Sequence, residues 1–355
     1  MSRNRSIDIA KGIGILLVVL GHNWIVAHEK TLLFQMIYSF HMPLFFLLGG
    51  VFLNPAQRFP SFLRSKADAL IKPYAVVLVL LGVLKIAAGL TTPSRYFPGV
   101  LYGVGATIDW TPLWFLPSLF ITMVFVWLLL NTLRDERHPT LGLSAIIVAL
   151  FLLGDATVTA YSDIPFTPTP HLPLLAPGNT RLAGLPFSLD MLPFSAACLL
   201  LGYLCRRQLQ EMQFQPRYLM VATVTFIASH LLFSYPTDLN ARVYGHWLLT
   251  PLRALSGIYI VLELSALIAR HKLAAPALAY LGQASLFILI FHAAVEWSAF
   301  GRLVTVFPKY KYAIGVLTCV GGVALPLILL EISQRISIMS RLLLPRRARV
   351  NAIKL

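Results

Sequence analysis

Long apolar runs separated by short polar connections follow one another along this chain of 355 residues. The first run, Ile13–Leu20, has Asp8 and Lys11 before it and His22 after it. A helix needs about 20 mostly apolar residues to cross a bilayer. On this pattern we predict ten membrane helices, over residues 7–26, 33–53, 70–90, 113–132, 141–156, 187–205, 217–235, 247–268, 277–297 and 312–333.

The composition agrees with a membrane protein. Hydrophobic residues make up 57% of the chain and charged residues 12%, and the mean hydropathy is +0.75. Soluble domains carry about 25% charged residues, so we predict an all-α, polytopic transmembrane helical bundle of about ten spans. No linker divides the chain, and we expect a single transmembrane domain over 1–340 followed by a basic cytoplasmic tail over 341–355. The first predicted span, over residues 7–26, is too long for the apolar region of a signal peptide, so we expect none there.

The formal net charge of +15 would suit a nucleic-acid partner. The positions of the charges argue against one, because they lie in short segments between the apolar runs. With the N-terminus inside, 20 of the 29 Lys and Arg residues fall on the inner side and 7 on the outer side. Positive charge gathers on the cytoplasmic side of membrane proteins. We therefore predict cytoplasmic termini, a multi-pass protein of the plasma (bacterial inner) membrane, and the lipid bilayer as partner in place of nucleic acid.

The chain offers no familiar catalytic or metal-binding motif. Its three cysteines, Cys198, Cys205 and Cys319, lie in apolar runs, where free cysteine packs as a small apolar residue. They are too few for a disulfide framework, and no metal site is predicted. We find no G-x-S-x-G, H-E-x-x-H, Walker or H-x4-D motif. Any chemistry must come from isolated residues that helix packing brings together.

Histidines and charges inside the predicted spans are the candidates for that chemistry, because such residues face a bundle interior or a water-filled cavity. Asp8, Lys11 and His22 share one helix face. His22 follows Asp8 by 14 positions, and at about 100° per residue this rotation ends about 40° short of four full turns. His41 lies at a comparable depth on the next predicted helix. The two imidazoles either share a pocket or each form a hydrogen bond with a neighbouring helix.

Other polar residues in the spans form a second tier of candidates. Asp190 and Arg253 both fall in the outer halves of their spans, where a structural ion pair and a sugar-binding role are equally open. Glu263 and His292 are further candidates for binding an acceptor. Glu296 lies near a span end and is expected to reach water.

Two connecting segments allow two interpretations each. The inner loop predicted over 64–74 carries Arg64, Lys66 and Lys72, which fit either a polyphosphate site or ordinary positive-inside charge. The outer segment 155–186 is rich in proline, which disfavours regular helix, and is either a passive connector or a lid over a site. Trp114, at the outer end of the fourth span, fits an interfacial aromatic belt or a stacking surface for sugar.

Four motifs in order carry a resemblance to a known family: RSIDIAKGIGILLVVLGH, SFHMPLFFLLGGVF, FLRSKADALIKPY and PLWFLPSLF. Over about residues 5–125 the chain resembles the acyltransferase-3 family of integral membrane proteins, in particular its fucose 4-O-acetylase-like branch. FHAAVEW, over 291–297, is similar to the late histidine segment of the family.

The resemblance implies a protein of roughly ten helices that moves an acyl group from cytoplasmic acyl-CoA to a sugar hydroxyl of a cell-surface or secreted glycan. It implies no bound cofactor, with acetyl-CoA as the default donor substrate. His22 matches the essential histidine of the family. Asp8 and Lys11 match its acidic and basic pair, with Lys in place of the more frequent Arg, and Arg64 and Lys66 match its basic residues loosely.

These expectations combine into a mechanistic hypothesis. The phosphates of acyl-CoA bind near Lys11, Arg64 and Lys66, and His22 takes the proton of the acceptor hydroxyl, since histidine has an ordinary pKa of about 6.5. A transient acyl group on His22 is the alternative route. His41 either orients His22 or stabilises the oxyanion.

Two other classes of function compete with the acyltransferase. A secondary transporter or flippase for a lipid-linked sugar also suits ten spans with buried charges, but it predicts inverted repeats, which we do not find in the sequence. A sensor or receptor is the third reading, and the short inner loops leave it little room for signalling parts. The acceptor stays open between exopolysaccharide, lipopolysaccharide, lipo-oligosaccharide and lipid-linked intermediates.

Overall fold

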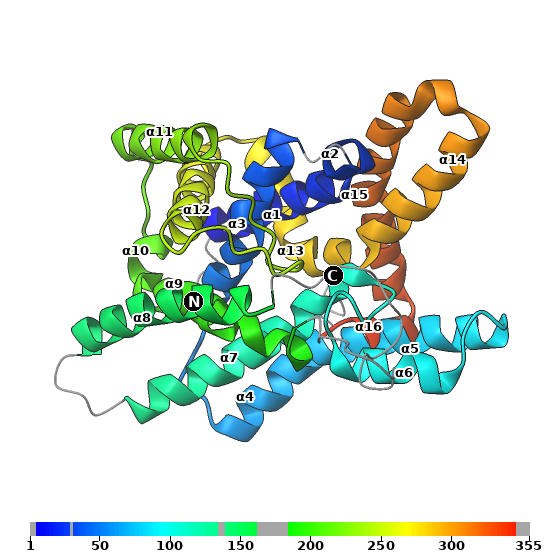
Figure 1. Cartoon of the computed structure of the whole chain (residues 1–355), viewed down its shortest axis with the longest axis horizontal. Helices are drawn as coiled ribbons and strands as arrows, with labels where there is room; N and C mark the ends of the chain where they lie inside the picture. The colour runs from blue at the N-terminus through cyan, green and yellow to red at the C-terminus, as the bar shows by residue number, and fades with distance from the viewer. Residues whose placement is uncertain (1–4, 29–30, 134–138, 162–183, 346–355) are drawn as a thin grey trace. The chain divides into compact units, whose positions relative to one another are not determined.

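The computed structural model describes residues 5–28, 31–133, 139–161 and 184–345. Within these ranges the regular secondary structure is helical, with no β-strand (Figure 1). Part of the proline-rich segment and the end of the predicted basic tail lie outside the described residues. The prediction of an all-α membrane protein is confirmed.

Each predicted span has a helix in the structure. The longer helices are α1 (Arg5–His22), α3 (Leu32–Val51), α5 (Lys72–Ala87), α7 (Phe115–Thr132), α8 (Pro139–Thr159), α9 (Leu192–Leu204), α11 (Pro216–Leu232), α12 (Leu249–Ile268), α13 (Ala274–Ala293) and α15 (Lys311–Arg335). Shorter helices are α2 (Trp24–His28), α4 (Phe59–Lys66), α6 (Pro93–Tyr102), α10 (Arg206–Gln210), α14 (Phe300–Val306) and α16 (Ser337–Leu343).

Eight helical runs among the described residues are long and apolar enough to cross a membrane. The two predicted spans outside this group are α1 and α11. Helix α1 carries Arg5, Asp8 and Lys11 in its first two turns, and α11 has only 17 residues. The count of ten spans and the cytoplasmic position of the termini stay predictions.

One local prediction is wrong. The segment 64–74, expected as a loop, is helical: α4 passes through the π-helical turn Ala67–Ile71 directly into α5. Pro73 is tolerated there because the first turn of a helix does not need its N–H. The sixth predicted span, 187–205, corresponds to the helical run Pro186–Leu204. Its first residues form a 3-10 turn in which Phe187 and Ser188 have positive φ angles of 54° and 60°, and regular α-helix starts at Leu192.

The described chain falls into two compact units. The first unit contains residues 1–52, 198–238 and 244–330, and the second contains 53–197, 239–243 and 331–355. The single domain over 1–340 and the basic tail over 341–355 stay predictions.

In the first unit α1 packs against α3, α12 and α13. Glycine permits the closest approach: a Cβ on Gly282 of α13 would overlap the carbonyl oxygen of Asp8, and one on Gly12 would overlap that of Leu278. His22 in turn lies beside His292, so α1 and α13 run parallel. Helix α3 runs antiparallel to α1, because Gly14 faces Leu44 and Gly21 faces Ile37.

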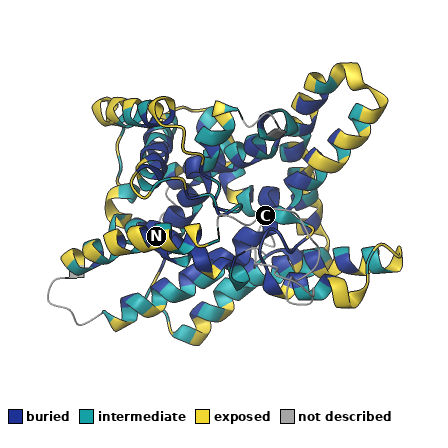
Figure 2. Ribbon diagram, in the orientation of Figure 1, coloured by how far each residue is buried: buried dark blue, intermediate teal, exposed yellow. Residues whose placement is uncertain are grey.

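Burial within the first unit follows this packing. Residues such as Ile7, Ile15 and Val18 on α1 are fully buried, and the dark blue segments of Figure 2 mark this core. Exposed apolar side chains such as Val224 on α11 and Val320 on α15 face outward. An apolar exterior over a packed interior is what a bilayer solvent requires.

In the second unit α7 packs against the turn Ala67–Ile71 and against the 3-10 turn Pro186–Met191. The hydroxyls of Thr122 on α7 and Ser195 on α9 lie within hydrogen-bond distance, 2.8 Å apart. Helix α16 packs on α5. Lys85, near the end of α5, forms an ion pair with Asp109, with 2.8 Å between Nζ and Oδ2.

Candidate functional site

His22 is the last residue of α1, and its ring orientation is set by its own helix. Nδ1 lies 2.9 Å from the carbonyl oxygen of Val18, one turn earlier. A carbonyl only accepts hydrogen bonds, so Nδ1 carries the ring proton and Nε2 of the neutral ring keeps its lone pair. Among the described residues Nε2 has no hydrogen-bond partner, and His22 is only half-buried. The ring therefore presents a basic nitrogen on an accessible side.

The end of α1 at His22 has a local cause. The side-chain oxygen of Asn23 accepts a hydrogen bond from the N–H of Ile25, as a capping residue does for the following helix. The Asn23 amide also donates to the carbonyl of Gly315 on α15 at 2.9 Å. These bonds end α1 at His22 and fix that helix end within the bundle.

Three further rings gather around His22. The His292 ring meets it edge to face, with centroids 5.0 Å apart. The Tyr38 ring lies 5.9 Å from that of His22 and 4.8 Å from that of His41, and the Trp297 ring lies 6.2 Å from that of His22. We call these five residues the histidine cluster. The structure thus brings together His22, His41 and His292, which the sequence singled out separately.

His41 and His292 differ from His22 in burial. Their exposed fractions are 3% and 0%. Each holds its Nδ1 proton on its own helix, His41 on the carbonyl of Ile37 at 2.8 Å and His292 on that of Ile288 at 3.0 Å. Neutral His41 then has no N–H left for an oxyanion, which leaves it as a hydrogen-bond acceptor beside His22.

A π-helical turn at the end of α13 places Glu296 and Trp297 near the histidine cluster. Helix α13 passes at its end into the π-helical turn Ala294–Ala299, and single π turns within helices are frequent at functional sites. The indole N–H of Trp297 donates to the backbone carbonyl of His22 at 3.4 Å. Glu296 is 1% exposed, so the expectation that it reaches water is wrong.

The charged start of α1 belongs to the same unit. Asp8 is buried at 6% exposure. The Lys11 ammonium lies 4.6 Å from the centroid of the Phe52 ring, within range of a cation–π interaction. One helix therefore carries this charged pair at its beginning and His22 at its end.

The other basic candidates lie in the second unit. Arg64 is exposed, and the Lys66 ammonium lies 5.7 Å from the Phe62 ring centroid. Lys72 has structural partners: its Nζ lies 2.8 Å from Oδ1 of Asp68 and donates to the carbonyl of Leu344 at 2.7 Å. The Lys72 charge is thus engaged within the protein.

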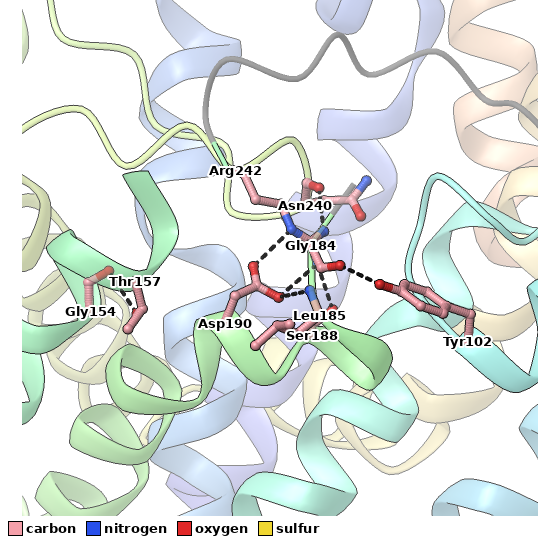
Figure 3. A network of polar contacts seen from close by, with 9 residues as sticks. All are labelled: Tyr102, Gly154, Thr157, Gly184, Leu185, Ser188, Asp190, Asn240 and Arg242. Atoms are coloured by element: carbon pink, nitrogen blue, oxygen red, sulfur yellow. Dashed lines mark hydrogen bonds and ion pairs between the residues drawn. The ribbon is translucent and has the colours of Figure 1, made fainter. Parts of the chain in front are cut away.

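Asp190 is the centre of a buried polar network in the second unit (Figure 3). Arg242 Nε lies 3.0 Å from Asp190 Oδ2, with both side chains at 3% exposure or less. Asp190 Oδ1 also accepts from the backbone N–H of Leu185 at 2.8 Å, and Arg242 donates to Ser188 at 3.2 Å. The network holds the strained turn around Ser188, so Asp190 has a structural role.

Tyr102 extends this network at its other side. Its hydroxyl donates to the carbonyl of Gly184 at 2.7 Å (Figure 3). Burial raises the pKa of Tyr102, which keeps the hydroxyl protonated and able to donate.

The considered pairing of Asp190 with Arg253 is wrong. Arg253, in the first unit, is 2% exposed and donates to the backbone carbonyls of Ser229, Phe233 and Tyr235. The Arg253 guanidinium is thus engaged in hydrogen bonds with the end of α11 and with the residues after it. The partner of Asp190 is Arg242, which the sequence places in an outer connecting segment.

Glu263 borders a separate cavity of about 630 Å³ in the first unit. Its side chain is fully buried, accepting from the Tyr259 hydroxyl at 2.7 Å and from the Gln215 N–H at 2.7 Å. The cavity wall is largely apolar, with Leu47, Leu201 and Ile258 among its residues.

Two predictions about other chemistry can be compared with the described residues. Trp114 is 4% exposed, so its ring offers no free face for a sugar and does not form an exposed aromatic belt. In the described ranges no group of three or more His, Cys, Asp or Glu side chains is arranged to hold a metal ion.

An all-helical chain with eight candidate membrane helices and a cluster of histidines among them defines a multi-pass membrane protein with a candidate site for proton transfer. The chain belongs to the acyltransferase-3 family: the sequence model of that family, described as an acyltransferase domain, matches residues 4–331. It is therefore a membrane acyltransferase.

One curated relative is the nodulation protein NolL of Mesorhizobium japonicum. It is 30% identical to this chain over 158 residues, which cover 42% of this chain and 41% of the relative. The alignment thus spans less than half of the relative. No solved structure matches the chain.

Proposed function

We propose that this protein transfers an acyl group, most simply acetyl, from acyl-CoA to a sugar hydroxyl of a cell-surface or secreted glycan, with His22 as general base. The observation that carries the proposal is the state of His22. Its Nδ1 proton is held by Val18, its Nε2 has no partner among the described residues, and its ring is half-buried. A neutral imidazole with a free Nε2 lone pair can act as a general base.

The proposed reaction balances without a resident cofactor. His22 Nε2 takes the proton from the acceptor hydroxyl as its oxygen bonds to the thioester carbonyl carbon. The carbon–sulfur bond breaks, and the leaving thiolate receives the proton from the His22 imidazolium. General-base assistance of this kind contributes roughly 10²–10⁴-fold. His41 is proposed to accept a hydrogen bond from the His22 imidazolium once it forms and so to keep that ring oriented during transfer.

The alternative route through an acyl-His22 intermediate uses the same lone pair. In that route Nε2 attacks the thioester first, and the acceptor hydroxyl then attacks the acyl-imidazole. A brief chase of labelled enzyme with unlabelled acetyl-CoA distinguishes the two, because only the covalent route leaves label on the protein.

Acyl-CoA is proposed to bind through basic residues. Lys11, supported by Asp8, in the first unit and Arg64 and Lys66 in the second unit are each candidates for binding its phosphates. CoA carries several phosphate charges, and both Arg and Lys bind phosphate, Arg in a bidentate way and Lys as a point charge. Lys72, engaged with Asp68 and Leu344, is assigned a lesser part. We place the protein in the bacterial inner membrane, with the glycan acceptor reaching the histidine cluster from outside.

The direct experiment follows the label of [14C]acetyl-CoA added to membranes that contain the protein and the glycan of the cell. Transfer of label to glycan, lost in His22→Asn at equal protein abundance, supports the proposal. A transporter or flippase of a lipid-linked sugar would leave acetyl-CoA intact in both samples, and that result would overturn it.

A further inference from the structure

Glu296 is a buried carboxyl group with fewer hydrogen bonds than a buried polar group usually forms. Its exposed fraction is 1%, and neither carboxyl oxygen forms a hydrogen bond of normal geometry with a described residue, although the Asn23 side chain interacts with the group. Buried polar groups are hydrogen-bonded in nearly all cases, because leaving one unpaired costs about 1–3 kcal/mol and more when it is charged. A buried carboxyl group in this state is expected to form hydrogen bonds with a bound ligand when the protein is working.

Glu296 lies at the His22 end of α1. A Cβ on Gly322 of α15 would come within 3.2 Å of both the Glu296 side chain and Val19, one turn before His22. Asn23, the residue after His22, interacts with the Glu296 carboxylate. The next residue, Trp297, donates to the carbonyl of His22. The carboxylate therefore stands beside the proposed base.

A second buried atom at the same place is unsatisfied in the same way. His292 precedes Glu296 by four residues, and its Nδ1 is bonded to its own helix. Its Nε2 is buried with no hydrogen-bond partner among the described residues. The carboxyl oxygens of Glu296 and the bare nitrogen of the neutral His292 ring can both accept a hydrogen bond.

The chemistry of an occupant follows from this set of atoms. Glu296, His292 and His22 all present acceptors, so the matching ligand supplies several O–H or N–H donors from one small body. A metal ion is a poor fit, since no three such side chains in the described ranges are arranged to hold one. A polyhydroxylated ring matches this chemistry, because each sugar hydroxyl can donate a hydrogen bond.

We propose that Glu296 and His292 bind hydroxyl groups of the acceptor sugar and so determine which hydroxyl reaches His22. This inference rests on the proposed function and adds the acceptor subsite to it. The hydroxyls bonded to Glu296 and His292 stay protonated, and the one presented to His22 loses its proton and receives the acyl group.

The test separates transfer from hydrolysis. Membranes containing wild type, Glu296→Gln, Glu296→Asp, Gly322→Ala or His22→Asn receive [14C]acetyl-CoA, and label is measured in glycan and in free acetate. Glu211→Gln is the matched control, because it makes the same chemical change on a side chain that is 67% exposed and paired with Arg207. Abundance and detergent melting temperature are recorded for every variant.

Glu296→Gln is expected to transfer at least about tenfold less label to glycan while its release of free acetate falls less than about twofold. Water needs no polyol subsite, so the ratio of transfer to hydrolysis reports binding of the acceptor. Glu296→Asp restores part of the ratio. Gly322→Ala, which crowds the carboxylate without removing it, lowers the ratio even if Glu296→Gln does not fold.

Two outcomes overturn the inference while leaving the proposed function intact. One is an unchanged ratio in Glu296→Gln and Gly322→Ala while His22→Asn has lost both products. The other is an equal loss of both products in the Glu296 variants at normal abundance, which assigns Glu296 to the donor step or to the fold. If His22→Asn keeps both products, the proposed function itself fails.

Discussion

The imidazole rings of His22 and His292 meet edge to face with centroids 5.0 Å apart, although 270 positions separate them in the sequence. The contact depends on the parallel packing of α1 against α13, which Gly12 and Gly282 allow by bringing the two backbones together. Helix packing at one end of α1 thus sets the geometry of the histidine cluster at the other.

Replacing Gly282 by Ala tests this dependence. The new methyl group would overlap the carbonyl oxygen of Asp8, and overpacking of this kind costs about 1–3 kcal/mol. We expect a lower melting temperature in detergent and reduced acyl transfer.

Gly301→Ala is the matched control. A Cβ there meets nothing within 4 Å, so this helical position tolerates or gains from Ala. Equal melting temperatures for the two variants would contradict the close approach of α1 and α13.

Replacing Asp190 by Asn tests the buried pair with Arg242. Removing one partner leaves a buried guanidinium uncompensated, which costs about 3–5 kcal/mol in other proteins. We expect a large fall in melting temperature or in protein abundance. The exposed pair Arg207–Glu211 serves as the comparison, because breaking it costs about 1 kcal/mol or less.

The activity of the surviving Asp190→Asn protein distinguishes a structural role from acceptor binding. If the variant is as stable as wild type and loses only glycan transfer, the structural assignment of Asp190 is wrong.

Arg64 and Lys66 are tested through the donor. Each replacement by Ala is expected to raise the KM for acetyl-CoA roughly fivefold, which corresponds to about 1 kcal/mol for a screened charge contact. Salt screens such contacts, so the wild-type KM should rise with ionic strength more steeply than that of either variant. Lys72→Ala should lower the melting temperature and leave the KM for acetyl-CoA nearly unchanged, since Asp68 and Leu344 hold its ammonium.

A KM for acetyl-CoA that is unchanged in both Arg64→Ala and Lys66→Ala, at any salt concentration, would remove these residues from the donor site.

The helices were predictable because each one corresponds to a local run of about 20 mostly apolar residues. The partners of α1 were not, because nothing local in residues 5–22 indicates that residues 274–293 pack beside them. The motifs did identify His22, His41 and His292 as candidates, and only the helix packing showed that they form one cluster.

The misread residues share a physical cause. Depth along a span suggested Arg253 as the partner of Asp190, but depth says nothing about which helices are neighbours. Glu296 was assigned to water from its position near a span end, whereas the π-helical turn Ala294–Ala299 rotates it into the bundle. A carboxylate four residues after an intramembrane histidine was the available signal.

The most direct measurement of the central claim compares His22→Asn with His271→Asn in the [14C]acetyl-CoA transfer assay. His271 is exposed, and its Nδ1 accepts from the N–H of Ala274, a contact that Asn can replace. The account predicts a loss of at least about 100-fold in His22→Asn at normal abundance, with His271→Asn near wild type. Transfer by His22→Asn within about twofold of wild type would contradict the role of His22 as the base, since that role contributes roughly 10²–10⁴-fold.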